Sequence, residues 1–226
     1  MIFSEVIAVL LGDPTVTFCE VPTGGLIERP WYLLSNLPYF LVGFYLLFGY
    51  AHSQIARVLG IATLAIGFFS SFYDITYTFG AQLLDLGGMF FFIMLLLALN
   101  IERYRGGLKN THKSWFHPLL ITFLVICLMF VLYLWKGVLG NYLFALLALL
   151  AISSEYFAYS KNKTTNYKNW KIAIALFLVG SAIWMLDGLH IWCSPVAILN
   201  GRAIFHYFTS IVMLFLFYFY RQFENR

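Results

Sequence analysis

The chain has 226 residues, of which 62% are hydrophobic and only 11% are charged. Because a soluble domain carries about 25% charged residues, this composition excludes a soluble protein and predicts an integral membrane protein. The formal net charge of +4 then concerns membrane orientation and lipid headgroups, and it gives no reason to expect a nucleic-acid partner.

Seven apolar runs are long enough to cross a bilayer, which requires about 20 residues in a helix. An N-terminal outer segment over residues 1–30 precedes the first of them. The runs lie at about 31–50, 54–73, 77–100, 116–135, 138–158, 170–191 and 202–221. The sequence therefore predicts an all-α integral membrane fold, a single domain over residues 1–226 built as a seven-transmembrane-helix bundle.

The basic residues are divided unevenly between the two sides of such a bundle. Most of the Lys and Arg residues fall in the loops at 101–115 and 159–169 and at the chain end, which all lie on one side. Cytoplasmic loops of membrane proteins are enriched in these residues. We therefore expect the N-terminus outside and the C-terminus in the cytoplasm. The compact length favours a multi-pass protein of a bacterial inner membrane.

Polar side chains gather in the outer half of this predicted bundle. Ser70 and Asp74 are four residues apart and share one face of the second helix, and Arg202 and His206 do the same on the seventh. Asp85 lies roughly 12 Å below the start of the third helix, at 1.5 Å per residue. Ionisable groups in hydrocarbon are costly unless they face a protein interior or a wet cavity. We therefore expect a polar pocket that opens outward.

The sixth helix adds a further polar pair, Asp187 and His190, three residues apart. Each of these residues also has an ordinary structural explanation. A serine such as Ser70 often bonds to the backbone of its own membrane helix, and a histidine near an interface often serves as an amphipathic anchor. Asp85 could likewise be a buried structural carboxylate that only accepts hydrogen bonds.

Several segments resemble the alkaline ceramidases, a family within the CREST superfamily of seven-helix membrane hydrolases. Residues 70–74 (SSFYD) and 82–89 (QLLDLGGM) resemble the family pattern of Ser, three residues, His, then Gln-Leu-Leu-Asp-Glu-x-Pro-Met. Residues 201–206 (GRAIFH) resemble its last-helix motif, His-x-x-Trp-His, and 184–193 (WMLDGLHIWC) resemble the Asp-to-Cys segment before it. Two shorter signatures, at 18–20 (FCE) and 35–37 (SNL), are also similar, so the resemblance covers almost the whole chain.

The resemblance implies a hydrolase that acts on a membrane lipid. In that family three histidines hold a zinc ion whose bound water attacks an amide, and a metal lowers the pKa of such a water to about 7. Ser70 and Asp85 would be the catalytic residues, with Ser70 steadying the oxyanion and Asp85 handling the proton. His206 would be a ligand of the metal.

Two of the three family histidines are replaced in this chain, one by Asp74 and one by Arg202. Aspartate can bind zinc, whereas a guanidinium has no lone pair to offer. Two arrangements therefore stay open. In the first, Asp74, His190 and His206 form a zinc site of two histidines and one carboxylate, with Asp187 and Arg202 lining it. In the second, Asp74 and Arg202 form an ion pair in place of the metal.

The resemblance also implies two features of the outer surface. The first is a disulfide between Cys19 and Cys193, which both fall on the predicted outer face, where disulfides persist. The second is a calcium site in the N-terminal segment. Glu20 is the side chain that matches it, and Glu28 or Asp13 would have to substitute for a missing ligand.

Two functions from different classes follow from these observations. One is a membrane hydrolase that cleaves the amide bond of ceramide or a related lipid in an outward-facing pocket. The other is a catalytically silent relative that binds a lipid or acts as a receptor-like or structural membrane protein. A transporter is the third alternative, although polar residues confined to one half of the membrane argue against alternating access. The sequence does not indicate the oligomeric state.

Overall fold

The computed structural model describes residues 10–105, 122, 124, 139–161, 164–191, 193 and 199–224. Every regular element within these residues is a helix. Six helical stretches in them are long and apolar enough to cross a membrane, as expected for an integral membrane protein. The predicted fourth span, at about 116–135, falls almost entirely outside the described residues. The number of seven spans and the side of each terminus therefore stay predictions.

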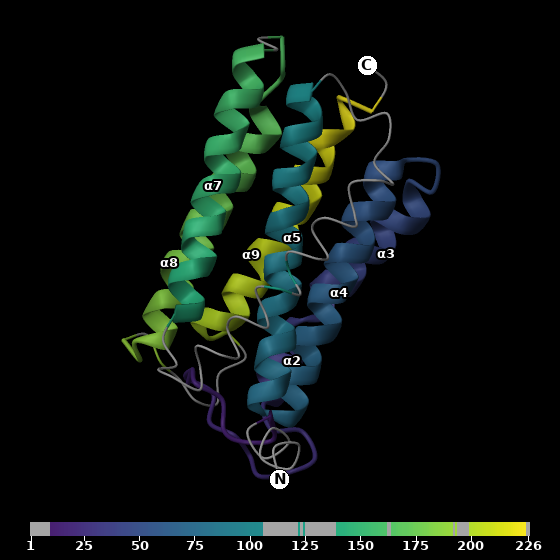
Figure 1. The fold of residues 1–226 in the computed structure, drawn as a ribbon. Helices are drawn as coiled ribbons and strands as arrows, with labels where there is room; N and C mark the ends of the chain where they lie inside the picture. The colour runs from purple at the N-terminus through teal and green to yellow at the C-terminus, as the bar shows by residue number, and fades with distance from the viewer. Residues whose placement is uncertain are drawn as a thin grey trace.

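The helices form a bundle in which the N-terminal segment lies at one end and the end of the last helix at the other (Figure 1). They are α2 (Pro30–Ser35), α3 (Leu37–Gly49), α4 (Gln54–Thr76), α5 (Phe79–Arg105), α7 (Leu139–Lys161), α8 (Lys168–Gly188) and α9 (Gly201–Arg221). Neighbours in sequence pack in pairs, α3 with α4, α4 with α5, and α8 with α9, while α7 packs on α5. Because α9 also packs against α2, α3 and α4, it joins the two halves of the bundle.

The first predicted span is broken into α2 and α3 at Asn36. Pro38 in the first turn of α3 has no N–H to donate to the carbonyl four residues earlier, so an uninterrupted helix would lose a bond there. Side chains compensate, because Ser35 Oγ and Asn36 Nδ2 both donate to the carbonyl of Tyr32, at 2.7 Å and 3.2 Å. The break directs these two polar side chains toward the bundle interior, where both residues are buried.

A tight turn connects α4 to α5. Tyr77 adopts a left-handed conformation with φ of 46°, and its N–H donates to the carbonyl of Tyr73 at 2.8 Å, which ends α4. The N–H of Phe79 at the start of α5 donates to the carbonyl of Gly12 at 2.9 Å. The turn and the N-terminal segment together fix the ends of both helices, and with them Asp74 and Asp85.

The start of α9 is held closely against the end of α8. Asn200 caps α9, since its Oδ1 accepts from the N–H of Ala203 at 3.0 Å. A Cβ at Gly201 would lie 2.7 Å from the carbonyl oxygen of Ile183 and 2.7 Å from Cβ of Asp187. Only glycine allows this close approach, which brings the following residue, Arg202, next to Asp187.

Candidate functional site

The end of α4 and the starts of α5 and α9 lie at the end of the bundle beside the N-terminal segment (Figure 1), and they carry polar residues that the sequence places in the outer half. Ser70 and Asp74 come from the last turns of α4, Asp85 from the first turns of α5, and Arg202 and His206 from the start of α9. All five are buried.

Asp74 is completely buried and receives three donors. Arg29 Nη2 lies 2.7 Å from its Oδ1 and Arg202 Nη2 lies 3.3 Å from the same oxygen. Asn36 Nδ2 donates to Oδ2 at 2.9 Å. The predicted ion pair between Asp74 and Arg202 is therefore present, but its shorter partner is Arg29, which the sequence did not single out.

Arg202 lies at the centre of the site. Its Nη2 contacts Asp85 Oδ2 at 3.3 Å as well as Asp74, and its Nε lies 3.5 Å from His206 Nε2. The guanidinium also lies over the rings of Phe18 and Tyr73, at 4.7 Å and 5.0 Å. Its third nitrogen, Nη1, is buried and has no hydrogen-bond partner.

Asp85 is the carboxylate of the site that faces free space. Its side chain is 13% exposed, whereas that of Asp74 is 0% exposed. The hydroxyl of Ser70 lies beside it as a hydrogen-bond donor, and both residues line a cavity. Asp85 can therefore meet a bound molecule, while Asp74 cannot.

The ring of His206 is held in one tautomer by its neighbours. Ser35 Oγ lies 2.7 Å from His206 Nδ1 and 2.7 Å from the carbonyl oxygen of Tyr32. A serine hydroxyl has a single hydrogen, which it donates to the carbonyl, so Nδ1 must donate its own hydrogen to Ser35. Nε2 is then an acceptor, and it faces Nε of Arg202.

Asp187 does not line the cavity but holds the end of the bundle together. Its Oδ1 accepts from the N–H of Cys19 at 2.9 Å and its Oδ2 accepts from the N–H of Arg202 at 2.9 Å. The hydroxyl of Tyr32 donates to it at 3.0 Å. The predicted disulfide between Cys19 and Cys193 is present beside it. This carboxylate therefore ties the N-terminal segment, α2, α8 and α9 to one another.

His190 is not among the residues that line the cavity, although its N–H donates to the carbonyl of Asp187 at 2.9 Å. The expected sixth helix ends at Gly188 instead of continuing to 191, and His190 follows it in a left-handed conformation with φ of 55°. Its ring is exposed, and its Nδ1 lies 3.7 Å from Cys193 Sγ. The expectation that Asp187 and His190 share a helix face is therefore wrong, because α8 stops between them.

Glu20 anchors the start of α2. Its two carboxylate oxygens accept from the N–H groups of Trp31 at 2.8 Å and Tyr32 at 2.7 Å. Burial raises the pKa of Glu20 above its usual value, although these two hydrogen bonds oppose the shift. Both carboxylate oxygens of Glu20 thus already bond to the protein backbone. The calcium site itself stays a prediction.

The residues present do not fit a zinc ion. The donors that could surround one are Asp74, Asp85 and His206, and the guanidinium of Arg202 already contacts all three. A guanidinium offers no lone pair to a metal and its charge repels a dication. Within the part of the chain that the structure describes, no group of three or more His, Cys, Asp or Glu residues is arranged to hold a metal ion.

Arg29 is the site residue that sequence reasoning missed. It is completely buried and lies over the rings of Tyr73 and Tyr77, at 4.2 Å and 4.4 Å, in addition to its bond with Asp74. The position of Arg29 in the sequence is the signal that could have identified it. Few basic residues fall on the predicted outer side, and Arg29 immediately precedes an apolar run at Pro30.

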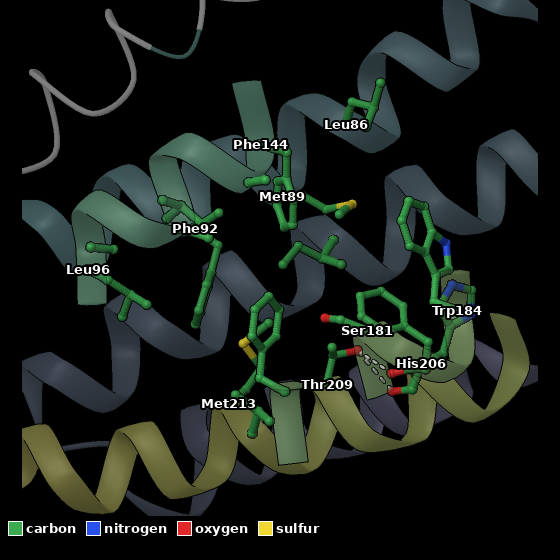
Figure 2. Close-up of a pocket in the computed structure, with 18 of the residues that line it drawn as sticks. Leu86, Met89, Phe92, Leu96, Phe144, Ser181, Trp184, His206, Thr209 and Met213 are labelled. Carbon is green, nitrogen blue, oxygen red and sulfur yellow. Dashed lines mark hydrogen bonds between the residues drawn. The ribbon is translucent and has the colours of Figure 1, made fainter. Parts of the chain in front are cut away.

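A cavity of about 470 Å³ begins at this site and extends along the bundle between α5, α7, α8 and α9. Asp85, Arg202 and His206 line its polar end. Figure 2 shows His206 and Trp184 at that end and Leu96 at the far one, with apolar side chains between them. A volume between about 300 and 1,000 Å³ is typical of small-molecule sites, and this one suits an amphiphile.

The fold and the site define a class of protein, a multi-span helical membrane protein with a buried charged site at the mouth of an apolar internal cavity. A family model for ceramidases matches residues 29–225, so the chain belongs to the ceramidase family. At the level of the family, this match supports a ceramidase-like hydrolase and suggests a lipid substrate. A comparison with curated proteins finds no match.

Proposed function

We propose that this protein takes a neutral long-chain lipid amide, such as a ceramide, into its cavity and hydrolyses the amide bond at the polar end without a metal ion. The observation that carries the proposal is the apolar cavity whose polar end is lined by Asp85, Arg202 and His206. Arg202 also has a buried nitrogen, Nη1, without a hydrogen-bond partner. A buried donor without a partner costs about 1–3 kcal/mol. A ligand oxygen that accepts from it recovers that cost.

The charges around the cavity favour a neutral ligand. Two guanidinium groups, Arg29 and Arg202, lie beside two carboxylates, Asp74 and Asp85, in three close ion contacts. No positive charge is left over for an anionic headgroup, whose transfer into this site would add an uncompensated charge. An amide carbonyl needs a donor but no counter-ion, and Arg202 Nη1 supplies the donor.

The same residues supply the elements of amide hydrolysis. Negative charge develops on the carbonyl oxygen when water attacks, and a preorganised donor such as Arg202 Nη1 stabilises it. Asp85 faces the cavity and accepts the proton of the attacking water, with Ser70 orienting its carboxylate. The new bond joins the water oxygen to the carbonyl carbon, the carbon–nitrogen bond breaks, and the proton passes to the departing amine. The products are a fatty acid and an amine.

A second function is binding of the same lipid without hydrolysis. Arg202 stands where the family places a metal ligand, and metal-activated water is therefore not supported by the residues of this site. The two functions share the ligand and differ only in turnover.

The test measures binding and turnover separately on purified protein in lipid nanodiscs with a chelator present. Binding of a non-hydrolysable ceramide analogue, together with release of fatty acid from a fluorogenic ceramide, supports the hydrolase. In that case Asp85→Asn abolishes release of fatty acid and leaves the Kd of the analogue within about threefold of the wild-type value. Binding without release for the wild-type chain supports the silent relative. Absence of binding overturns both functions.

A further inference from the structure

The cavity is polar at its two ends and apolar between them. On α5 its lining runs from the polar residues Gln82 and Asp85 to Asn100, and on α9 from the polar residues Arg202 and His206 to Tyr220. Between these limits the lining of both helices is apolar except for Thr209, whose hydroxyl donates to the carbonyl of Phe205 at 2.7 Å. Figure 2 shows the apolar stretch, with Met89, Phe92, Leu96 and Met213 around one channel. A single hydrocarbon chain fits such a channel lengthwise.

A hydrogen-bonded layer, here called the floor, lies at the far end of the cavity. The hydroxyl of Tyr220 donates to Asn100 Oδ1 at 2.7 Å, and Asn100 Nδ2 donates to Ser154 Oγ at 2.9 Å. Asn100 and Tyr220 are 2% and 1% exposed. Together these bonds join α5, α7 and α9 across the end of the channel.

A second layer supports this floor from behind. Arg103 forms a buried ion pair with Glu155, and the hydroxyl of Tyr167 donates to Glu155 at 2.6 Å. A hydrocarbon chain that pushed through would separate these groups and leave them buried without partners, which is costly. The chain end must therefore stop at Asn100 and Tyr220.

The distance between the two ends sets a chain length. Asn100 follows Asp85 by 15 residues, which is about 22 Å along a helix at 1.5 Å per residue. An extended chain of single bonds advances about 3.3–3.6 Å for every three bonds, or about 1.2 Å per bond. The cavity therefore accommodates a chain of about 18 bonds.

We infer that Asn100 and Tyr220 act as a floor that fixes the longest chain this protein accepts, at about 16 to 18 carbons. This inference rests on the proposed function, because it requires a lipid amide whose carbonyl lies at Arg202. A shorter chain leaves empty volume above the floor, and a longer one does not fit.

The test is a competition series with fatty amides of ethanolamine, whose acyl chains range from about 8 to about 24 carbons, against a fixed labelled ceramide in nanodiscs. The expected affinity is greatest at about 16 to 18 carbons and at least about tenfold weaker at both ends of the series. The amount of each competitor in the nanodisc bilayer is measured and used as its concentration, because partitioning from water changes by about 0.8 kcal/mol for each CH₂.

A variant with a bulky side chain partway along the cavity shortens the space for the chain and tests the geometry directly. Ala148 lines the cavity on α7 and packs at the level of Ile93, which follows Asp85 by eight residues, or about 12 Å. Ala148→Phe should therefore move the optimum to about 10 to 12 carbons. The matched control is Leu149→Phe on the same helix, where the side chain is 61% exposed and the optimum should stay unchanged.

Each outcome separates this inference from the function on which it rests. A wild-type affinity that does not depend on chain length, or an optimum that Ala148→Phe leaves in place, overturns the floor while lipid binding stands. Failure of every chain length to bind overturns the proposed function as well. If Ala148→Phe does not fold, the wild-type series alone decides.

Discussion

Arg202 connects more of the site than any other described side chain, because one guanidinium contacts Asp74, Asp85 and His206. Without Arg202, two buried carboxylates lose a positive charge beside them. Breaking a buried ion pair costs about 3–5 kcal/mol. Arg202→Gln should therefore lower the free energy of unfolding in detergent by about 3 kcal/mol and abolish binding of the ceramide analogue.

Arg202→Lys separates the charge from the geometry. A lysine keeps the positive charge but cannot present several fixed donors at once, so it should recover most of the stability and little of the lipid binding. Chemical unfolding and analogue binding, measured on both variants, check this. A glutamine variant as stable as the wild type would show that the ion pairs contribute nothing to the fold.

Asp74 and Asp85 offer a second comparison. Both carboxylates contact Arg202, but they differ in how exposed they are. Asp74 is enclosed by Arg29, Arg202 and Asn36, so Asp74→Asn should cost about 3 kcal/mol of stability. Asp85 faces the cavity, where water reaches it, so Asp85→Asn should cost about 1 kcal/mol and act mainly on fatty acid release. Equal losses of stability in the two variants would contradict the assignment of Asp85 as the reacting carboxylate.

At the scale of the helices, the positions of the spans follow from the sequence because a bilayer fixes their length. The described helices begin and end within a few residues of the predicted runs. The misplacement of His190 has a local cause, since α8 ends at Gly188 and a left-handed residue follows, and apolar periodicity does not reveal such a turn.

The sequence groups Ser70, Asp74, Arg202 and His206 because four-residue spacing fixes their faces on two long helices, and the structure brings these residues to one end of the bundle. Their roles in a site stay predictions. Arg29 was missed because it lies outside regular helix, where no periodicity applies, and reaches Asp74 only after the chain turns at the start of α2. Contacts made by irregular segments depend on the tertiary fold and leave little local signal.

The short helix α2 yields a prediction about pH. Burial raises the pKa of Glu20 from its ordinary value of 4.5, so the folded protein binds this proton more tightly than the unfolded chain does. The contribution of Glu20 to stability is then fully present below about pH 4.5 and is lost as the pH rises through the raised value. Glu20→Gln removes the titrating group and keeps its volume.

The unfolding midpoint of the wild type, relative to that of Glu20→Gln, should therefore fall as the pH rises above about 4.5. Thermal unfolding of both proteins below and above that pH measures the difference. A constant difference would mean that Glu20 titrates alike in the folded and unfolded states.

At the scale of the whole molecule, charges supplied by the chain itself hold together the end of the bundle. The segment before α2, the end of α4 and the start of α9 are far apart in sequence, and they converge on Arg29, Asp74 and Arg202. A metal ion joins helices in the same way when histidines from each of them bind it. In this protein, the ion contacts of Arg29, Asp74 and Arg202 join these three segments directly.

From these ion contacts we predict how the protein responds to a metal chelator. Incubation with a strong zinc chelator should leave the thermal unfolding midpoint and binding of the ceramide analogue unchanged, and elemental analysis should find far less than one zinc ion per chain. The double variant Asp74→His/Arg202→His restores three histidines with His206 and removes the guanidinium from among the donors. It should acquire about one zinc ion per chain, and its unfolding midpoint should then fall on chelation. One zinc ion per wild-type chain, lost in His206→Ala, would instead mean that a metal binds beside Arg202 in spite of its charge.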